Sequence, residues 1–223
     1  MNRTVLVVAA HTDDEALGCG GTIAKHVERG DTVFAVFLAD GVSSRPDARE
    51  QELSARIAAA DQAHKILGLK DSFMLGFPDN RLDTVPLLGI VQKLEQVVDE
   101  VQPQVVYTHH NGDLNIDHRI THQAALTACR PIPGSPVREI YSFEVPSATE
   151  WNTPSSNPFI PNIFVDISKH LGTKMSALAA YELEMREAPH SRSLLNLRRL
   201  AELRGSSVGL AAAEAMMAIR VIF

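Results

Sequence analysis

The chain is poor in the residues that mark several classes of protein. Cysteine occurs only twice in 223 residues, at Cys19 and Cys129, which argues against a disulfide scaffold and fits a reducing compartment. Lysine and arginine number 21 against 27 acidic residues, so a net charge of −6 offers no footprint for nucleic acid. No apolar run approaches the roughly 20 residues that span a bilayer, and the start does not resemble a signal peptide. We expect a soluble, cytoplasmic protein without a nucleic-acid partner or a membrane span.

The length and the apolar content are those of one globular domain. Hydrophobic residues make up 45% of the chain, which is enough for a sizeable core. A length of 223 residues is common for a single α/β domain. We expect one domain over residues 1–223, with an α/β core to about residue 130. Residues 131–223 would add edge strands, a loop and helices that complete the site.

Strands and helices are expected to alternate through the first 130 residues. Short runs of β-branched and apolar residues predict buried strands, and apolar residues repeated every three or four positions predict helices. This alternation predicts a Rossmann-like, mostly parallel sheet flanked by helices, with an active site at the C-terminal edge of the strands. The strands are expected at 4–10, 32–39, 72–75 and 104–108, and the helices at 14–30, 51–67, 85–101 and 121–129.

The regular alternation of strands and helices ends after residue 130. A proline-rich connection leads to a segment whose alternation predicts an edge strand at 138–145. A long ordered loop is expected at 147–161, where proline, asparagine and serine are dense. The remaining elements are expected to be a short strand at 165–167 and helices at 169–187, 194–204 and 210–217.

Side chains that can bind a metal follow two of the predicted strands. The segments are AAHTDDE at 9–15 and THHNGDLNIDH at 108–118. Ligands bind at the carboxyl ends of strands in open α/β sheets, so adjacent strands would bring the two segments together. Two imidazoles and one carboxylate, with a position open to water, form a common catalytic zinc arrangement. The groups available are His11, Asp13, Asp14, Glu15, His109, His110, Asp113, Asp117, His118 and His122.

Two other interpretations of these segments must be weighed. A single histidine after a strand is usually a hydrogen-bonded turn residue, and acidic residues stabilise the start of a helix. The glycines of GCGG at 18–21 could also suggest a dinucleotide site. However, a phosphate-binding motif needs glycines directly after the strand, and here that position holds Asp13, Asp14 and Glu15. We therefore expect the glycines to allow close packing of the helix on the sheet.

The two segments resemble the signature motifs of the LmbE-like, or PIG-L, deacetylases. AAHTDDEALGCGGTIAKH resembles the family motif AHPDDE, and GDLNIDHR resembles its later (H/N)xDH motif. LADGVSSR, AHKILG and the C-terminal PHSRS, LAELRG and AEA segments also look like family segments. The resemblance spans almost the whole chain, and its two core motifs are specific in combination.

The resemblance implies a zinc-dependent hydrolase that removes an acetyl group from an N-acetyl amino sugar or a related glycoconjugate. By the family pattern, His11, Asp14 and His118 would bind one zinc ion per chain. Asp13 would be the general base that activates the metal-bound water. Glu15 would cap the helix or orient a ligand. Other divalent metals remain possible, because two histidines and one aspartate can bind several.

The sequence departs from the family pattern at two positions. Thr12 replaces the usual proline, so its hydroxyl is expected to hold the turn. Asn115 stands where many members carry a histidine that protonates the leaving amine or steadies the oxyanion. Asparagine can donate to an oxyanion but transfers no proton at neutral pH. His109 or His110 could take that role, and we favour His110.

The remaining polar candidates are secondary. Asp117 is expected to hydrogen-bond a catalytic histidine, although it could be purely structural. Trp151 and Phe143 could form a wall for a sugar ring or simply pack in the core. Arginines in the first half could hold a hydroxyl or phosphate of the substrate, and PHSRS could reach the site from the C-terminal region or from a neighbouring subunit. The candidate substrate-binding residues are Arg45, Arg56, Arg81, His190 and Arg192.

Two alternative functions remain beside the deacetylase. The same metal site could hydrolyse a different amide or an ester, or the chain could be a metal- or sugar-binding protein without catalysis, in which Asn115 marks a lost general acid. The expected partner is a small N-acetylated sugar or glycoconjugate. Relatives often form trimers or hexamers, and the apolar C-terminal tail at 211–223 is compatible with a homo-oligomer.

Overall fold

The computed structural model describes residues 2–39, 41 and 50–223, and only the backbone of residues 50 and 51. Within this part of the chain, seven strands form one sheet in the order β3-β2-β1-β4-β5-β7-β6. This confirms the predicted α/β fold with a mostly parallel sheet. The strands are β1 (Thr4–Ala9), β2 (Thr32–Ala39), β3 (Asp71–Phe77), β4 (Val105–His109), β5 (Glu139–Phe143), β6 (Ile163–Asp166) and β7 (Ala213–Val221).

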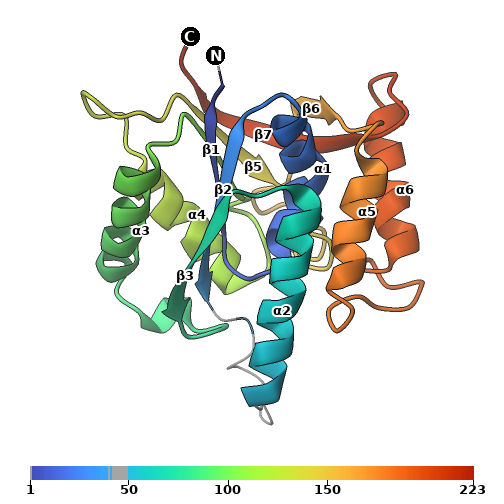
Figure 1. Cartoon of the computed structure of the whole chain (residues 1–223), viewed down its shortest axis with the longest axis horizontal. Coiled ribbons are helices and arrows are strands. Elements are labelled where there is room, and N and C mark those ends of the chain that lie inside the picture. The colour runs from blue at the N-terminus through green and yellow to red at the C-terminus, as the bar shows by residue number, and fades with distance from the viewer. Residues whose placement is uncertain (1, 40, 42–49) are drawn as a thin grey trace.

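Helices cover both faces of the sheet (Figure 1). Successive residues of a strand point to opposite faces, so Val5 and Val7 pack with one group of helices and Leu6 and Val8 with the other. The first face is covered by α1 (Asp14–Glu28), α2 (Glu50–Leu67), α5 (Leu171–Ala180) and α6 (Leu194–Ser206), and the second by α3 (Leu87–Val101) and α4 (Ile116–Ala128). A 3₁₀ turn, η1, spans Leu82–Thr84.

The order of the parallel strands reverses between β1 and β4. From β1 the chain continues to β2 and β3 on one side, and then crosses back to β4 and β5 on the other. β1 pairs in parallel with both β2 and β4. Such a reversal of strand order is where ligands bind in open α/β sheets, outside the carboxyl ends of the strands. The segments at 9–15 and 108–118 both begin there.

Two expectations for the C-terminal part of the chain were wrong. Residues 210–217 were expected to be helical, but Ala213–Val221 forms β7, antiparallel to both β5 and β6. Alanine, methionine and glutamate favour helices locally, and pairing on both sides overrides that preference. Because β7 covers β5, the segment expected at 138–145 as an edge strand is internal. Among the described strands, the two edges are β3 and β6.

Two helix boundaries also differ from expectation. α4 begins at Ile116, five residues earlier than expected, so Asp117 and His118 lie in its first turn. α5 ends at Ala180 rather than near residue 187. The chain leaves the helix there, and Tyr181 donates a hydrogen bond from its hydroxyl to Glu15 at 2.6 Å. None of the described helices combines the length and the apolar character that crossing a bilayer requires.

The glycines of α1 pack the helix against the sheet, as expected. A Cβ atom at Gly18 would overlap the Phe143 ring of β5, and one at Gly21 would lie 2.8 Å from Ile167. The helix is kinked at Cys19, where φ is −145°. Beyond the kink, the Glu214 carboxylate of β7 accepts hydrogen bonds from the backbone N–H groups of Gly21 and Thr22. Glu214 thereby caps the second half of α1 from outside the helix.

Candidate metal centre and active site

The turn after β1 is held by its own acidic residues. The backbone N–H of His11 donates to Asp14 Oδ2 at 2.9 Å, and that of Asp13 donates to Glu15 Oε2 at 2.9 Å. Asp13 has a φ of 107°, which is rare for a residue with a side chain. Such strain concentrates at functional sites, where the surrounding structure holds it in place. Glu15 thus bonds the backbone at the start of α1, which agrees with the first of its two expected roles.

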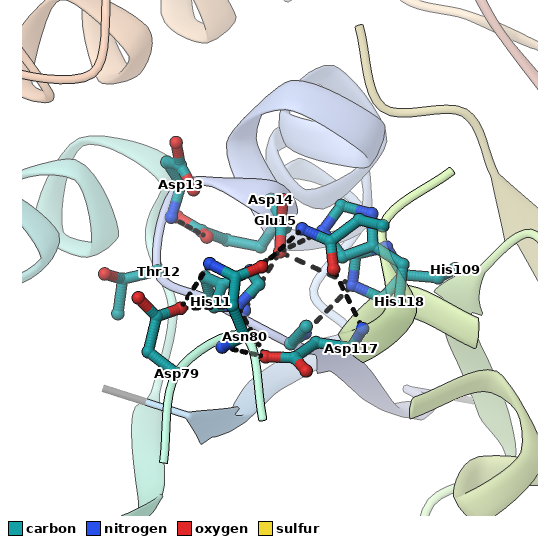
Figure 2. Close-up of polar contacts among 12 residues, drawn as sticks. His11, Thr12, Asp13, Asp14, Glu15, Asp79, Asn80, His109, Asp117 and His118 are labelled. Atoms are coloured by element: carbon teal, nitrogen blue, oxygen red, sulfur yellow. Dashed lines mark hydrogen bonds and ion pairs between the residues drawn. The ribbon is translucent and has the colours of Figure 1, made fainter. Parts of the chain in front are cut away.

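The second segment enters α4 through a side-chain cap. Asn115 is the N-cap residue, and its Oδ1 accepts a hydrogen bond from the N–H of Asp117 at 2.8 Å. Asparagine is among the best residues for this position. The cap therefore fixes Asp117 and His118 at the helix start, facing the turn that follows β1 (Figure 2). Asn115 Nδ2 lies 3.4 Å from Asn80 Oδ1.

The three predicted metal ligands converge. Asp14 Oδ2 lies 3.3 Å from His11 Nδ1 and 3.3 Å from His118 Nε2. One ligand atom from each residue fits within 4.8 Å of the others, and all three side chains are buried. The sequence brings them together because β1 and β4 are neighbours in the sheet.

The donor set fits a divalent metal ion. Asp14 Oδ1 and His118 Nε2 are buried without a hydrogen-bond partner of acceptable geometry among the described residues. Orphaned buried polar atoms are rare in folded proteins and point to a missing partner. Two imidazoles and a carboxylate are the ligand types of catalytic zinc sites.

The residues around His11, Asp14 and His118 stabilise a positive charge. Burial alone would lower the pKa of His118, but Asp14 and Asp113 outweigh it and raise the pKa to about 9. Burial also opposes the charged form of His11, yet Asp117, Asp14 and Asp79 raise its pKa well above the usual value. Burial would raise the pKa of Asp14, and the neighbouring His118 and His109 instead hold it well below its usual range. A cation is therefore favoured among these groups.

Carboxylates behind the ligands orient both imidazoles. His11 Nε2 lies 3.1 Å from Asp117 Oδ2 and 3.0 Å from Asp79 Oδ1. Asp117 is itself fixed, because it accepts hydrogen bonds from the N–H groups of Asn80 and Leu82. Asp117 thus bonds a histidine, as predicted, and that histidine is His11.

Asp113 orients the ring of His118 in the same way. Its Oδ2 lies 3.1 Å from His118 Nδ1 and accepts a hydrogen bond from the Thr149 hydroxyl at 2.8 Å. Contacts of this kind set the tautomer of a ligating histidine and hold its ring orientation.

Two arginines form ion pairs with the Asp13 carboxylate. Arg192 Nη1 donates to Asp13 Oδ2 at 2.9 Å, and Arg56 Nη2 lies 3.3 Å from Oδ1. Arg56 also bonds the hydroxyl and the carbonyl of Thr12, so that hydroxyl does help to hold the turn. Burial raises the pKa of Asp13 to about 6, and Arg192 and Arg56 offset only part of this. A carboxylate with such a pKa is suited to accept a proton near neutral pH.

The two histidines at the end of β4, His109 and His110, lie in different surroundings. His109 stacks on His118 with ring centroids 3.9 Å apart, and its Nε2 accepts a hydrogen bond from the Ala10 N–H. His110 Nε2 bonds the Asn157 carbonyl at 2.7 Å, and its ring contacts Phe159. The favoured role of His110 in protonating the leaving amine stays a prediction.

The other predicted side chains are dispersed. Arg81 is exposed at the start of η1. His190 lies against Trp151, with ring centroids 5.6 Å apart. Phe143 is fully buried in the core, so it forms no wall for a ligand. Arg45 lies outside the described residues.

The sequence reasoning missed three side chains that complete the site. Asp79 approaches His11 from the turn after β3, Glu184 bonds Arg56 Nη1 at 2.6 Å, and Tyr181 bonds Glu15. A signal for Asp79 was available, since it follows a parallel strand at the same sheet edge as the two motifs. Tyr181 and Glu184 lie in a segment expected to be helical, and no motif marked them.

Comparisons with known proteins point to one family. A family model described as PIG-L, GlcNAc-PI de-N-acetylase, matches residues 6–129. The uncharacterized deacetylase YaiS of Escherichia coli (strain K12) is 30% identical over 186 residues, covering 81% of this chain and 91% of that protein. The probable N-acetyl-alpha-D-glucosaminyl L-malate deacetylase 2 of Bacillus anthracis is 28% identical over 186 residues, covering 80% of each.

A solved structure shares the fold over nearly the whole chain. The N,N'-diacetylchitobiose deacetylase from Pyrococcus horikoshii has a TM-score of 0.80 to this chain and is 20% identical to it. The match covers 98% of this chain and 84% of the other. At this identity the likeness concerns the fold.

Proposed function

The chain belongs to the GlcNAc-PI de-N-acetylase (PIG-L) family, and on that basis we propose that it is a metal-dependent hydrolase that removes the acetyl group from an N-acetylated amino sugar. One observation carries the proposal. The family's two motifs meet at the carboxyl ends of β1 and β4, where His11, Asp14 and His118 form a buried donor set and the adjacent residue Asp13 is buried as well.

His11, Asp14 and His118 would hold the metal, and zinc is the ion that these ligand types fit well. When bound, a zinc ion supplies Lewis-acid chemistry that polarises a carbonyl and lowers the pKa of water. Asp117 and Asp79 would keep the His11 ring in place, and Asp113 would do so for His118.

Asp13 would move the proton. The carboxylate accepts a proton from the attacking water as the water oxygen bonds to the acetyl carbon. The C–N bond then breaks, the proton returns to the sugar nitrogen, and acetate and a free amine are the products. Asn115 cannot transfer a proton at neutral pH, so the return step would fall either to His110, the residue favoured from the sequence, or to the protonated Asp13. Arg56 and Arg192 would position this carboxylate.

The test is a product assay tied to metal content. Purified protein is stripped with a chelator, reloaded with zinc, cobalt or manganese, and given a panel of N-acetylated sugars. We expect equal amounts of free amine and acetate from the reloaded protein and none from the stripped protein. Release of another acid or of an alcohol would favour the alternative amide or ester hydrolase. Binding of metal and sugar without any product would favour the non-catalytic alternative.

Assembly and location stay predictions. A trimer or hexamer is expected, and light scattering on the purified chain measures its mass directly. Cell fractionation tests the expected cytoplasmic location.

A further inference from the structure

A cavity of about 530 Å³ lies among residues that the proposed reaction does not use. Its walls come from the segment that follows β5 and from the segment that runs from Pro189 into α6. Trp151 and His190 contact each other in its lining, with their rings inclined at 76°. The volume is within the range of small-molecule sites, which is about 300–1,000 Å³.

Arg192 joins this cavity to the proposed active site. Its Nη1 donates to Asp13, and its Nε donates to the Ser147 hydroxyl at 2.7 Å and approaches the Pro146 carbonyl at 3.3 Å. Pro146 lines the cavity, as do His190 and Ser191, which directly precede Arg192. The Arg192 guanidinium therefore bridges the Asp13 carboxylate and Pro146, a residue of the cavity lining.

The lining combines flat apolar surfaces with groups that can bond a hydroxyl. Trp151 is 53% exposed, so part of its indole surface is open to a ligand in the cavity. The Ser191 hydroxyl is shielded from solvent and has no hydrogen-bond partner among the described residues. His190 Nδ1 accepts a hydrogen bond from the Arg192 N–H, so the neutral ring carries its proton on Nε2 as a donor.

The charges of the lining disfavour an anion. Glu144 and Arg204 neutralise each other through two hydrogen bonds of 2.8 and 2.6 Å. Glu150 accepts from the Ser147 N–H with both oxygens, and this contact does not cancel its charge. The nearby Arg192 is already paired with Asp13. The cavity therefore carries a net negative charge, which would repel a carboxylate or phosphate.

We propose that this cavity binds a second, uncharged sugar residue that is glycosidically linked to the N-acetylated sugar. The proposal rests on the proposed deacetylase function and names its substrate class as a neutral glycoside of at least two rings. The N-acetylated ring would lie at Asp13, and the linked ring would lie beyond Arg192 against the Trp151 indole. Sugar rings present C–H groups to aromatic faces and hydroxyls to hydrogen-bonding groups, and the lining offers both.

Trp151 gives a direct signal for occupancy, because it is the chain's single tryptophan. The first experiment follows its fluorescence in the zinc-loaded Asp13→Asn variant, in which the ligand is not consumed. We expect a saturable change with N,N'-diacetylchitobiose and none with N-acetylglucosamine. N-acetylglucosaminyl malate, whose second group is anionic, should bind at least about tenfold more weakly than the disaccharide. An unchanged emission with the disaccharide, or equal binding of the malate glycoside, would overturn the proposal.

The second experiment measures kcat/KM for the disaccharide and for N-acetylglucosamine. Trp151→Ala should lower kcat/KM for the disaccharide by about tenfold and leave the value for N-acetylglucosamine nearly unchanged. The control is Leu203→Ala, an exposed residue of α6 outside the cavity lining, which should change neither. Thermal unfolding of each variant confirms that it is folded. An equal loss on both substrates, or no loss on either, contradicts the subsite.

The two proposals fail in different ways. If no compound releases an amine while the Trp151 emission still responds to the disaccharide, the deacetylase function is wrong and the sugar site stands. If amine is released while the emission and the Trp151→Ala kinetics show no preference for the disaccharide, the deacetylase stands and the subsite is wrong.

Discussion

His11 and Asp117 meet at 3.1 Å between Nε2 and Oδ2, although 106 residues separate them in the chain. This contact assigns the proton of the His11 ring to Nε2 and leaves Nδ1, 3.3 Å from Asp14, as the atom that can bind a metal. The ring orientation is fixed from behind because Asp117 accepts two backbone hydrogen bonds from the turn after β3. Three strands thus contribute to the placement of one ligand.

Replacing Asp117 should weaken metal binding without removing a ligand. Asp117→Asn loses the charge that orients His11, and substitutions behind a metal ligand typically cost about 10–100-fold in affinity. Zinc affinity measured by competition with a chromophoric chelator checks this. Asp99→Asn, an exposed change on α3, is the control and should bind zinc as the wild type does. An unchanged affinity in Asp117→Asn would show that the contact is incidental.

The glycines of α1 should respond differently to the same added methyl group. Gly21→Ala places a Cβ 2.8 Å from the buried Ile167, and such overpacking costs about 1–3 kcal/mol. At Gly20 the nearest atoms would be 3.5 Å away, so Gly20→Ala is the matched control. It should be neutral or stabilising by up to about 1 kcal/mol, since alanine favours a helix. Urea unfolding of both variants measures the difference, and equal stabilities would contradict the packing described.

The buried pair between Lys174 and Glu214 should be strongly coupled. Lys174 Nζ donates to Glu214 at 2.6 Å, and both side chains are buried. Glu214→Gln leaves the ammonium without its countercharge, at a cost of about 3–5 kcal/mol in the free energy of unfolding. Adding Lys174→Met should recover part of that loss, because no unpaired charge remains. A double variant whose loss equals the sum of the two single losses would refute the coupling.

Through His26, the fold should lose stability as the pH drops below about 6.5, the usual pKa of histidine. Burial lowers the pKa of His26, and its bond to Asp31 offsets only part of this. The unfolded chain therefore takes up a proton at a pH where the native chain does not, so acid favours unfolding.

His26→Gln should reduce this slope of the unfolding free energy between pH 7 and pH 5, measured by urea unfolding. Tyr107→Phe is the control. It removes the hydroxyl that bonds His26 Nε2 but keeps the imidazole, so the slope should persist. A slope that is unchanged in His26→Gln would show that this residue does not titrate as described.

The parts of the fold that depend on local sequence were predictable. β1, β2 and β4 are short apolar runs, and α3 shows a clear helical period, so neighbouring residues suffice to identify them. β7 could not be identified this way, because the residues of Ala213–Val221 include helix formers and become a strand only by pairing with β5 and β6. The same long-range pairing turned the expected edge strand into an internal one.

The candidate site also has contacts that were predictable from the sequence and contacts that were not. His11, Asp14 and His118 follow two strands that the βαβ pattern makes neighbours, so their convergence was predictable. The pairing of Arg192 with Asp13 spans 179 residues and depends on how the C-terminal segment folds over the sheet edge. Nothing in the local sequence around Arg192 indicates that its partner would be the proposed base rather than the substrate.

The central claim is that Asp13 acts on the substrate and does not hold the metal. The measurement that tests it most directly compares wild type and Asp13→Asn, each loaded with one equivalent of zinc, for bound metal and for amine release from N,N'-diacetylchitobiose. We predict the same metal content in both and a turnover lower by about 10²–10⁴-fold in the variant. Near-wild-type turnover in the metal-loaded variant, or loss of the metal itself, would contradict the account.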